Sequence, residues 1–165
     1  MLKTSRILSR AAVAGAAGLG LFVLAGPVLA QAGPQGPAAK AVGARQEGYK
    51  QLGAAFKTIN DELKASRPDM AAIAQAATRM RDLSVAAPRW FPKGSGPEAG
   101  VKTRAKPEIW TDAAGFAAAQ RNFQTETARL QTIAASGDLS ALRAQVRATG
   151  ATCGGCHDKY RVAQK

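Results

Sequence analysis

The chain has 165 residues, with 23 Lys and Arg residues against 11 Asp and Glu residues and a formal net charge of +12. This length suits one domain that buries about two thirds of the surface of its unfolded chain. The sequence contains no glycine-rich phosphate loop, no basic helix with interleaved aromatic residues and no zinc-finger spacing. Because these motifs are missing from the sequence, we interpret the charge as a soluble basic surface and not as a nucleic-acid interface.

Residues 1–30 have the pattern of a signal peptide. Three basic residues precede an apolar run over residues 11–29, and the run ends in small residues at Ala30. We expect cleavage after Ala30, export to the periplasm and a flexible leader rich in Pro and Gly over residues 31–39. The apolar run is nearly long enough to span a bilayer, so an uncleaved membrane anchor is the alternative. Removal of the segment leaves a net charge of +9, which suits steering toward acidic partners or anionic membrane surfaces.

Two helices are predicted in the first half of the remaining chain. Residues suited to a buried seam recur every three or four positions from Val42 to Leu63, which predicts a first helix. Residues 66–69 (SRPD) end that helix and begin a second, where the same spacing continues from Ile73 to Leu83.

Two further helices follow a long connection over residues 87–106, which is rich in Pro, Gly and basic residues. A connection of this length inside a compact domain is usually functional or a crossover. Pro107 opens the third helix, Gly137 ends it and Asp138 caps the fourth. The predicted fold is all-α, an antiparallel up-and-down four-helix bundle over residues 40–165.

The fourth helix contains the sequence Cys153-Gly154-Gly155-Cys156-His157, which is typical of haem attachment. In this motif two thiols add across the haem vinyl groups, and the adjacent imidazole binds the iron. The chain has two cysteines and one histidine, and all three lie in these five residues. The cysteines continue the three- and four-residue spacing of the buried positions of this helix, so a haem held there is enclosed by the bundle.

Other uses of a C-x-x-C pair fit less well. A thioredoxin-like redox pair belongs next to a βαβ unit, at a helix N-terminus, and a structural zinc site needs four ligands. Neither these sites nor a structural disulfide calls for the histidine that follows the second cysteine. A haem-free dithiol protein remains the alternative from another class.

The sequence resembles the class II c-type cytochromes, which include cytochrome c′ and its low-spin, methionine-ligated relatives. The resemblance runs from about Ala41 to Arg161. Three motifs carry it: Arg45-Gln46-x-x-Tyr49, Val101-Lys102-Thr103-Arg104-x-Lys106-Pro107-Glu108, and Cys153-x-x-Cys156-His157-x-x-Tyr160-Arg161.

The resemblance implies one haem c, attached through Cys153 and Cys156, with His157 as the proximal iron ligand. It also implies that Arg45 and Gln46 approach a haem propionate. A buried guanidinium needs such a partner, although Arg45 is close enough to the start of its helix to reach solvent instead.

The resemblance places three further residues around the haem. Glu98 corresponds to a position near the haem edge. Arg161 corresponds to a basic residue near the exposed haem face, although it also suits a helix C-terminus as a plain cation. Tyr49 corresponds to a distal position occupied either by a ligating methionine or by a side chain that does not ligate. A neutral phenol is a poor ligand, so we expect Tyr49 to wall the distal side without binding iron.

The functional expectation is an exported mono-haem cytochrome with five-coordinate, high-spin iron. Such a protein binds NO or CO, or exchanges single electrons with acidic redox partner proteins, without turning over a substrate. The resemblance also implies a homodimer, formed here through the first two helices. The alternative within the family is a six-coordinate, low-spin electron carrier whose sixth ligand comes from an upstream helix.

Overall fold

The computed structural model describes residues 36–163. The predicted signal peptide, its cleavage site after Ala30 and residues 31–35 of the predicted leader lie outside the described residues. The helices are α1 (Pro37–Glu62), α2 (Met70–Ala86), α3 (Glu108–Thr111), α4 (Ala113–Ser136) and α5 (Leu139–Tyr160), with short 3₁₀ turns at Ala87–Trp90 and Pro97–Ala99.

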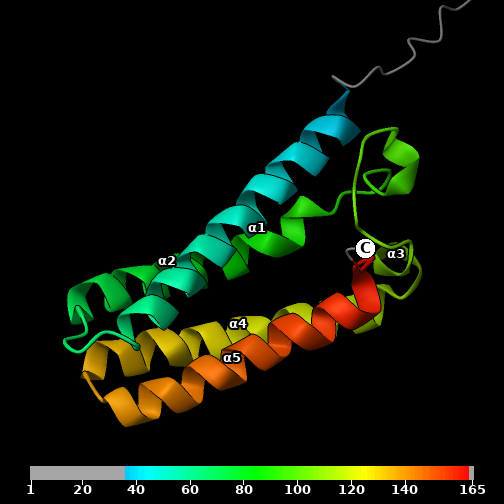
Figure 1. Ribbon diagram of the computed structural model, residues 1–165. Coiled ribbons are helices and arrows are strands. Elements are labelled where there is room, and N and C mark those ends of the chain that lie inside the picture. The colour runs from blue at the N-terminus through cyan, green and yellow to red at the C-terminus, as the bar shows by residue number, and fades with distance from the viewer. Residues whose placement is uncertain (1–35, 164–165) are drawn as a thin grey trace, which may run out of the picture. The chain divides into compact units, whose positions relative to one another are not determined.

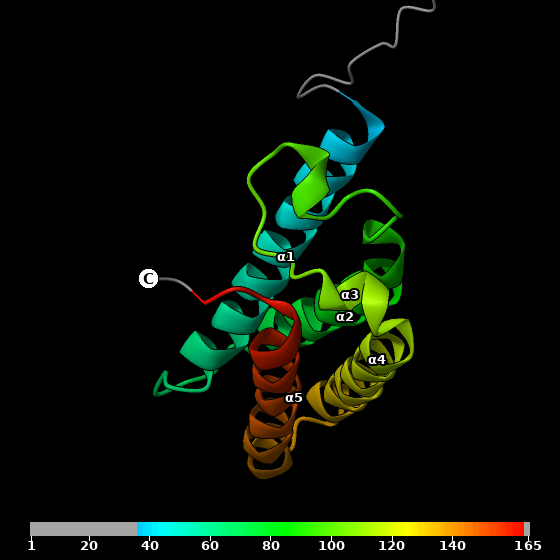
Figure 2. The ribbon, with the colours of Figure 1, turned by 90° about the vertical axis from the view of Figure 1, so that its right-hand side faces the viewer.

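The four long helices form an antiparallel up-and-down bundle, as predicted (Figure 1). The α1 and α2 helices form one hairpin, α4 and α5 form another, and α2 packs against α4. The start of α1, the end of α2, the start of α4 and the end of α5 therefore share one end of the bundle. The connection from α2 to α4 crosses this same end (Figure 2).

The helix boundaries follow local capping chemistry. The Asp69 carboxylate accepts hydrogen bonds from the backbone N–H groups of Ala71 and Ala72, and Asp138 caps α5 in the same way. Gly137 ends α4 in the left-handed conformation, with a φ of 79°. Helix α1 begins at Pro37, inside the predicted leader, because proline is well tolerated in the first turn of a helix.

The predicted third helix is broken, contrary to the expectation of one continuous helix from Pro107 to Gly137. Asp112 leaves the helical conformation, with φ −113° and ψ 56°, and its side chain caps α4 through the backbone N–H of Gly115. The apolar period continues across the break, so hydrophobic spacing alone did not reveal it.

The hydrophobic core fills the end of the bundle away from the long connection. Ile59, Ile73, Leu130 and Leu142 are fully buried there, and each contributes about 1.5–3 kcal/mol through burial. A smaller cluster of Ile109, Phe116 and Tyr160 lies at the other end. No helix among residues 36–163 is both long enough and apolar enough to cross a membrane.

The buried face of α1 differs from the predicted seam at Tyr49. Gly48 is buried, whereas Tyr49 is 36% exposed. The indole of Trp90 lies against Gly48, so closely that an added Cβ would stand 2.4 Å from the ring atom Cη2. A glycine is needed at this position because the long connection packs directly on the α1 backbone.

We predict that Gly48→Ala destabilises the protein by about 1–3 kcal/mol, the usual cost of overpacking. The matched control is Gly43→Ala in the same helix, where nothing lies within 4 Å of an added Cβ; it should stabilise the protein by roughly 0.5–1 kcal/mol. Urea unfolding followed by far-UV circular dichroism measures both. If both substitutions changed the free energy of unfolding equally, the close packing of Trp90 on Gly48 would not be what makes this glycine necessary.

Candidate haem site

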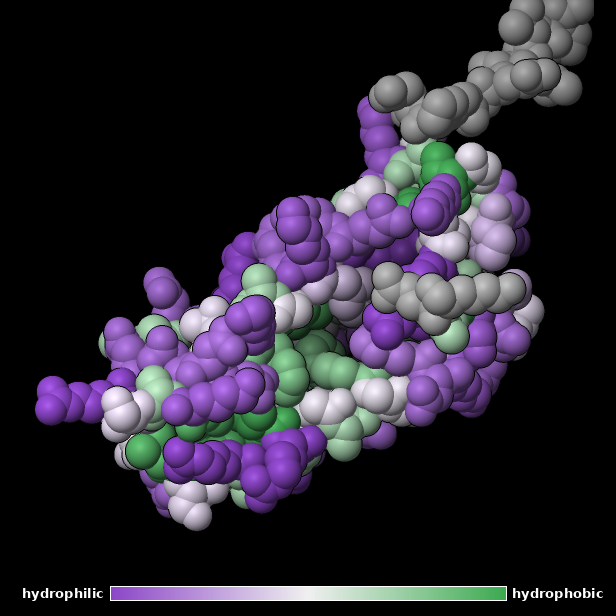
Figure 3. Space-filling model, viewed as in Figure 1, coloured by the Kyte–Doolittle hydropathy of each residue, from purple (hydrophilic) through white to green (hydrophobic). Residues whose placement is uncertain are grey.

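A cavity of about 660 Å³ lies at the end of the bundle crossed by the long connection. Its walls come from α1, α4, α5 and the connection. The space-filling view shows a hollow whose interior is apolar and whose rim is hydrophilic (Figure 3). The volume falls within the usual range for small-molecule and cofactor sites, about 300–1,000 Å³.

The lining combines apolar side chains with positive charge. Leu52, Phe56, Phe91, Phe116 and Phe123 are among its apolar members. The charged residues of the lining are Arg45, Lys50, Arg104 and Arg161, and no Asp or Glu of residues 36–163 belongs to it. An apolar cavity with only cationic groups suits a ligand that is largely apolar and carries negative charge at its edge.

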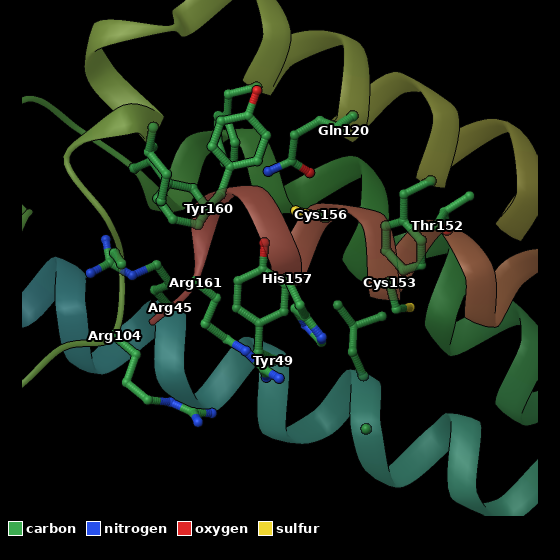
Figure 4. Close-up of a pocket in the computed structure, with 18 of the residues that line it drawn as sticks. Arg45, Tyr49, Arg104, Gln120, Thr152, Cys153, Cys156, His157, Tyr160 and Arg161 are labelled. Carbon is green, nitrogen blue, oxygen red and sulfur yellow. The ribbon is translucent and has the colours of Figure 1, made fainter. Parts of the chain in front are cut away.

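The haem-attachment motif faces this cavity from the last turns of α5, as the helical spacing predicted (Figure 4). Cys153, Cys156 and His157 are all partly buried, and neither thiol is in a disulfide. Burial raises the pKa of both thiols above the usual cysteine value. Burial, and then the charges of Arg161 and Arg104, lower the pKa of His157, so its imidazole is neutral and free to bind metal at neutral pH.

Arg45 does not reach solvent: it is only 3% exposed. Its guanidinium donates to the Ser95 carbonyl at 2.9 Å, the Ser95 hydroxyl at 3.2 Å and the Thr103 hydroxyl at 3.0 Å. It also lies over the Phe91 ring, 4.8 Å from the centroid. Arg45 thus borders the cavity and also fastens the long connection to α1, a role beyond the predicted contact with a haem propionate.

Gln46 also ties the connection to α1, because its amide donates to the Lys102 carbonyl at 2.9 Å while its side chain borders the cavity. Glu98 was expected near the haem edge, but it does not belong to the lining. Its carboxylate instead accepts a hydrogen bond of 3.2 Å from the Gly96 N–H, within the 3₁₀ turn of the connection.

Arg161 borders the cavity beside Arg104, as expected for a residue one turn after His157. An isolated antiparallel bridge between Ala105 and Arg161 sets this arrangement. It is flanked by backbone hydrogen bonds from Lys106 to Tyr160 at 3.0 Å and from Val162 to Arg104 at 2.9 Å. The chain just before α3 is thereby joined to the end of α5.

Tyr49 enters the cavity from α1, opposite the haem-attachment motif (Figure 4). Its ring packs edge-on against Trp90 and Phe91, with centroids 5.2 Å and 6.2 Å away. Burial, and then the neighbouring Cys156, raise the pKa of the Tyr49 phenol well above its usual value. The phenol is therefore neutral at physiological pH.

Sequence reasoning missed two cavity residues, Arg104 and Gln120. Each has a buried nitrogen without a hydrogen-bond partner among the described residues, Nη1 in Arg104 and Nε2 in Gln120. Arg104 belongs to the second motif of the family resemblance, but the helical pattern does not predict the path of the connection that carries it. Gln120 could have been noticed as a polar residue between Phe116 and Phe123 on the buried stripe of α4.

These residues fit a haem. The cavity offers two thiols for thioether bonds, a neutral imidazole for the iron, apolar walls for the porphyrin and cations for its carboxylates. The free Nη1 of Arg104 is a donor that a carboxylate would satisfy. A helical bundle with this site in its last helix belongs to the c-type cytochromes of the four-helix class.

Comparison with known proteins supports the same conclusion. A family model described as cytochrome C′ matches residues 40–161. The cytochrome c′ of Alcaligenes xylosoxydans xylosoxydans is 37% identical over 121 residues, which make up 73% of this chain and 92% of that relative. The chain therefore belongs to the cytochrome c′ family, and its cofactor is haem c.

Solved structures of cytochromes c′ share the fold. A ferrous variant of the Alcaligenes xylosoxidans protein with bound NO has a TM-score of 0.69 at 32% identity, covering 77% of this chain and 97% of that one. A carbon monoxide-bound variant of the same protein also has a TM-score of 0.69, at 33% identity and with coverage of 76% and 97%. A cytochrome c′ described as having ligand-controlled dimer dissociation has a TM-score of 0.71 at 26% identity, with the same coverage.

Asp112 joins the start of α4 to the end of α5 next to the site. Its carboxylate contacts the Lys159 ammonium at 2.6 Å, the Tyr160 hydroxyl at 2.8 Å and the Gly115 N–H at 3.1 Å. These three interactions, in that order, lower the pKa of Asp112 to about 2.

We predict that the carboxylate of Asp112 stabilises the fold at neutral pH and that this contribution disappears in acid. Its pKa in the folded state is below its ordinary value of about 3.9, so the stabilisation is complete above that value and is lost as the pH falls toward 2. Asp112→Asn should therefore lower the urea midpoint at pH 7, and the difference from the parent protein should shrink toward pH 3.

The control is Asp138→Asn, because Asp138 caps α5 through Ser140 and Ala141 and has no cation within ion-pair distance in the described residues. This change should have a smaller effect. A pH-independent loss for Asp112→Asn would contradict the assignment.

Proposed function

We propose that the chain is an exported mono-haem cytochrome c′ whose iron is five-coordinate and high-spin. The haem supplies an iron that can bind a diatomic gas or exchange one electron. The chain's residues attach the haem through Cys153 and Cys156, ligate its iron through His157 and enclose it between α1, α4 and α5. The observation that carries this proposal is the position of all three motif residues on one apolar, cation-lined cavity.

The side opposite His157 supports the five-coordinate form. Neither Met70 nor Met80 belongs to the lining, and Met80 is buried in the core of the bundle at 1% exposure. Tyr49 stays protonated because burial raises its pKa, so it walls the cavity without binding iron. Lys50 has a largely exposed side chain that lies 3.9 Å from Glu47. These placements favour the five-coordinate protein over its low-spin alternative.

The cations around the cavity support two further roles. We assign Arg104, with Arg45 and Gln46 beside it, to the haem carboxylates, and Arg161 to the exposed edge of the haem. The positive rim then suits an acidic redox partner protein, which opposite charge would steer to the haem edge.

The solved relatives with bound NO and CO support binding of these gases by this chain. We propose gas binding or electron transfer without substrate turnover. The structure does not favour the haem-free dithiol alternative, because a reactive dithiol needs a lowered thiol pKa and burial raises both pKa values here.

We also propose that the protein is exported to the periplasm and forms a homodimer. Cytochrome c′ proteins are periplasmic in general, which agrees with cleavage after Ala30 and with haem attachment outside the cytoplasm. We propose a homodimer formed through α1 and α2, supported by the relative whose dimer dissociates under ligand control.

Expression with a cytochrome maturation system should yield a protein that keeps its haem after denaturation. Intact mass and a pyridine haemochrome spectrum measure the covalent attachment. Cys153→Ala and Cys156→Ala should each lose one thioether and shift the haemochrome band, and the double variant should lose covalent haem. A colourless parent protein with two free thiols would exclude every cytochrome interpretation.

The ferrous protein should show a broad, high-spin spectrum that changes on addition of CO. Tyr49→Met places a thioether at the position where low-spin relatives carry their ligand, so it should give sharp, split low-spin bands and weaker CO binding. Tyr49→Leu is the control and should stay high-spin. A parent protein with low-spin bands that ignores CO would favour the six-coordinate alternative.

A further inference from the structure

Gln120 is a polar exception on the apolar side of α4. The cavity-facing positions of this helix are Phe116, Ala119, Gln120 and Phe123, so a glutamine stands between two aromatic rings about one turn away on each side. Its side chain is only 5% exposed. A leucine or methionine there would pack against the neighbouring rings without leaving a polar group to satisfy.

The amide nitrogen of Gln120 has no hydrogen-bond partner within residues 36–163. The amides of Gln46, Gln124 and Gln145 all donate to protein atoms: to the Lys102 carbonyl, the Ser84 carbonyl and Glu126, respectively. A buried donor without an acceptor is unfavourable, because it loses its hydrogen bonds to water and gains none. Unlike those three amides, the Gln120 amide therefore keeps a donor for a further acceptor.

The free amide points into the space where a ligand would lie. Figure 4 shows the Gln120 side chain extending from α4 toward Cys156, and Tyr49 entering the same space from α1. Both side chains border the same cavity, and the Gln120 side chain lowers the pKa of the Tyr49 phenol against the larger rise that burial and Cys156 cause. Two neutral hydrogen-bonding groups from different helices thus share an otherwise apolar region of the cavity.

We propose that the Gln120 amide donates a hydrogen bond to the small ligand bound in this cavity. The site would then favour diatomic ligands with an acceptor atom over apolar ligands of the same size, because only the former satisfy the buried donor. This inference rests on the proposed gas binding and adds a residue that determines which gases are held. The competing role for Gln120 is to position the Tyr49 hydroxyl, with no contact to the ligand.

The test uses the haem-loaded protein with CO as the probe. Gln120→Met removes the donor and keeps the length of the side chain, and Gln120→Leu is a second variant of similar volume. The readouts are the C–O stretching frequency of the ferrous CO complex and the rate of CO dissociation. Gln124→Met is the matched control, because this residue is one turn further along α4 and its amide donates outside the cavity at 3.2 Å.

Loss of the donor should raise the C–O stretching frequency, because a nearby positive N–H group draws electron density into the C–O antibonding orbitals. CO dissociation should become roughly two- to tenfold faster, the equivalent of one net hydrogen bond. Gln124→Met should leave both readouts unchanged. Unchanged haem content and absorbance of the CO-free variants would show that the site itself is intact.

A double-mutant cycle with Tyr49→Phe separates the two roles of Gln120. If Gln120→Met still shifts the stretching frequency in the Tyr49→Phe background, the amide acts on the ligand directly. If its effect disappears there, Gln120 only positions Tyr49, and the inference is wrong. A parent protein that binds CO with readouts unaffected by Gln120→Met would overturn this inference alone, whereas a parent protein that binds no CO would also overturn gas binding.

Discussion

The buried guanidinium of Arg45 holds the long connection against α1, and the shape of the haem cavity depends on this attachment. A buried cation must have its donors satisfied. The two Nη atoms of Arg45 donate to Ser95 and Thr103, and the guanidinium lies over the face of Phe91. The connection is thereby fixed as a wall of the cavity. Because Phe91 also packs edge-on against Phe116 of α4, at a centroid distance of 4.8 Å, the wall reaches from α1 to α4.

Bundle packing and site formation are separated along the helices. The aliphatic core closes one end, where Ile59, Ile73, Leu130 and Leu142 leave no room between the helices. At the other end aromatic side chains such as Phe91 and Phe116 line the cavity. The end of α5 is held there by Asp112 and by the bridge between Ala105 and Arg161. This division allows a rigid scaffold to carry a wide cavity, because the helices are already fixed by their contacts at the closed end.

The charges and protonation states of the lining residues suit the binding of a haem. Burial keeps the Tyr49 phenol protonated, and burial with two nearby arginines keeps His157 neutral. The charged groups of the lining are all cations, so they suit the carboxylates of a haem and an acidic partner at its edge. The neutral side chains of Tyr49 and Gln120 line the same cavity from α1 and α4.

The fold class, the four long helices and the haem-attachment motif could be predicted from the amino-acid sequence. They follow from local rules: helical spacing, caps such as Asp69 and Asp138, and a five-residue motif. Family resemblance predicted that five further residues lie around the haem. Four of them, Arg45, Gln46, Tyr49 and Arg161, line the cavity, whereas Glu98 lies in the connection outside the lining. The three-dimensional structure was needed to find three features: the break at Asp112, the use of Arg45 to fasten the connection, and the presence of Arg104 and Gln120 in the lining. These features depend on contacts between segments far apart in the chain, such as Asp112 with Tyr160 and Arg45 with Ser95, and helical periodicity carries no information about such contacts.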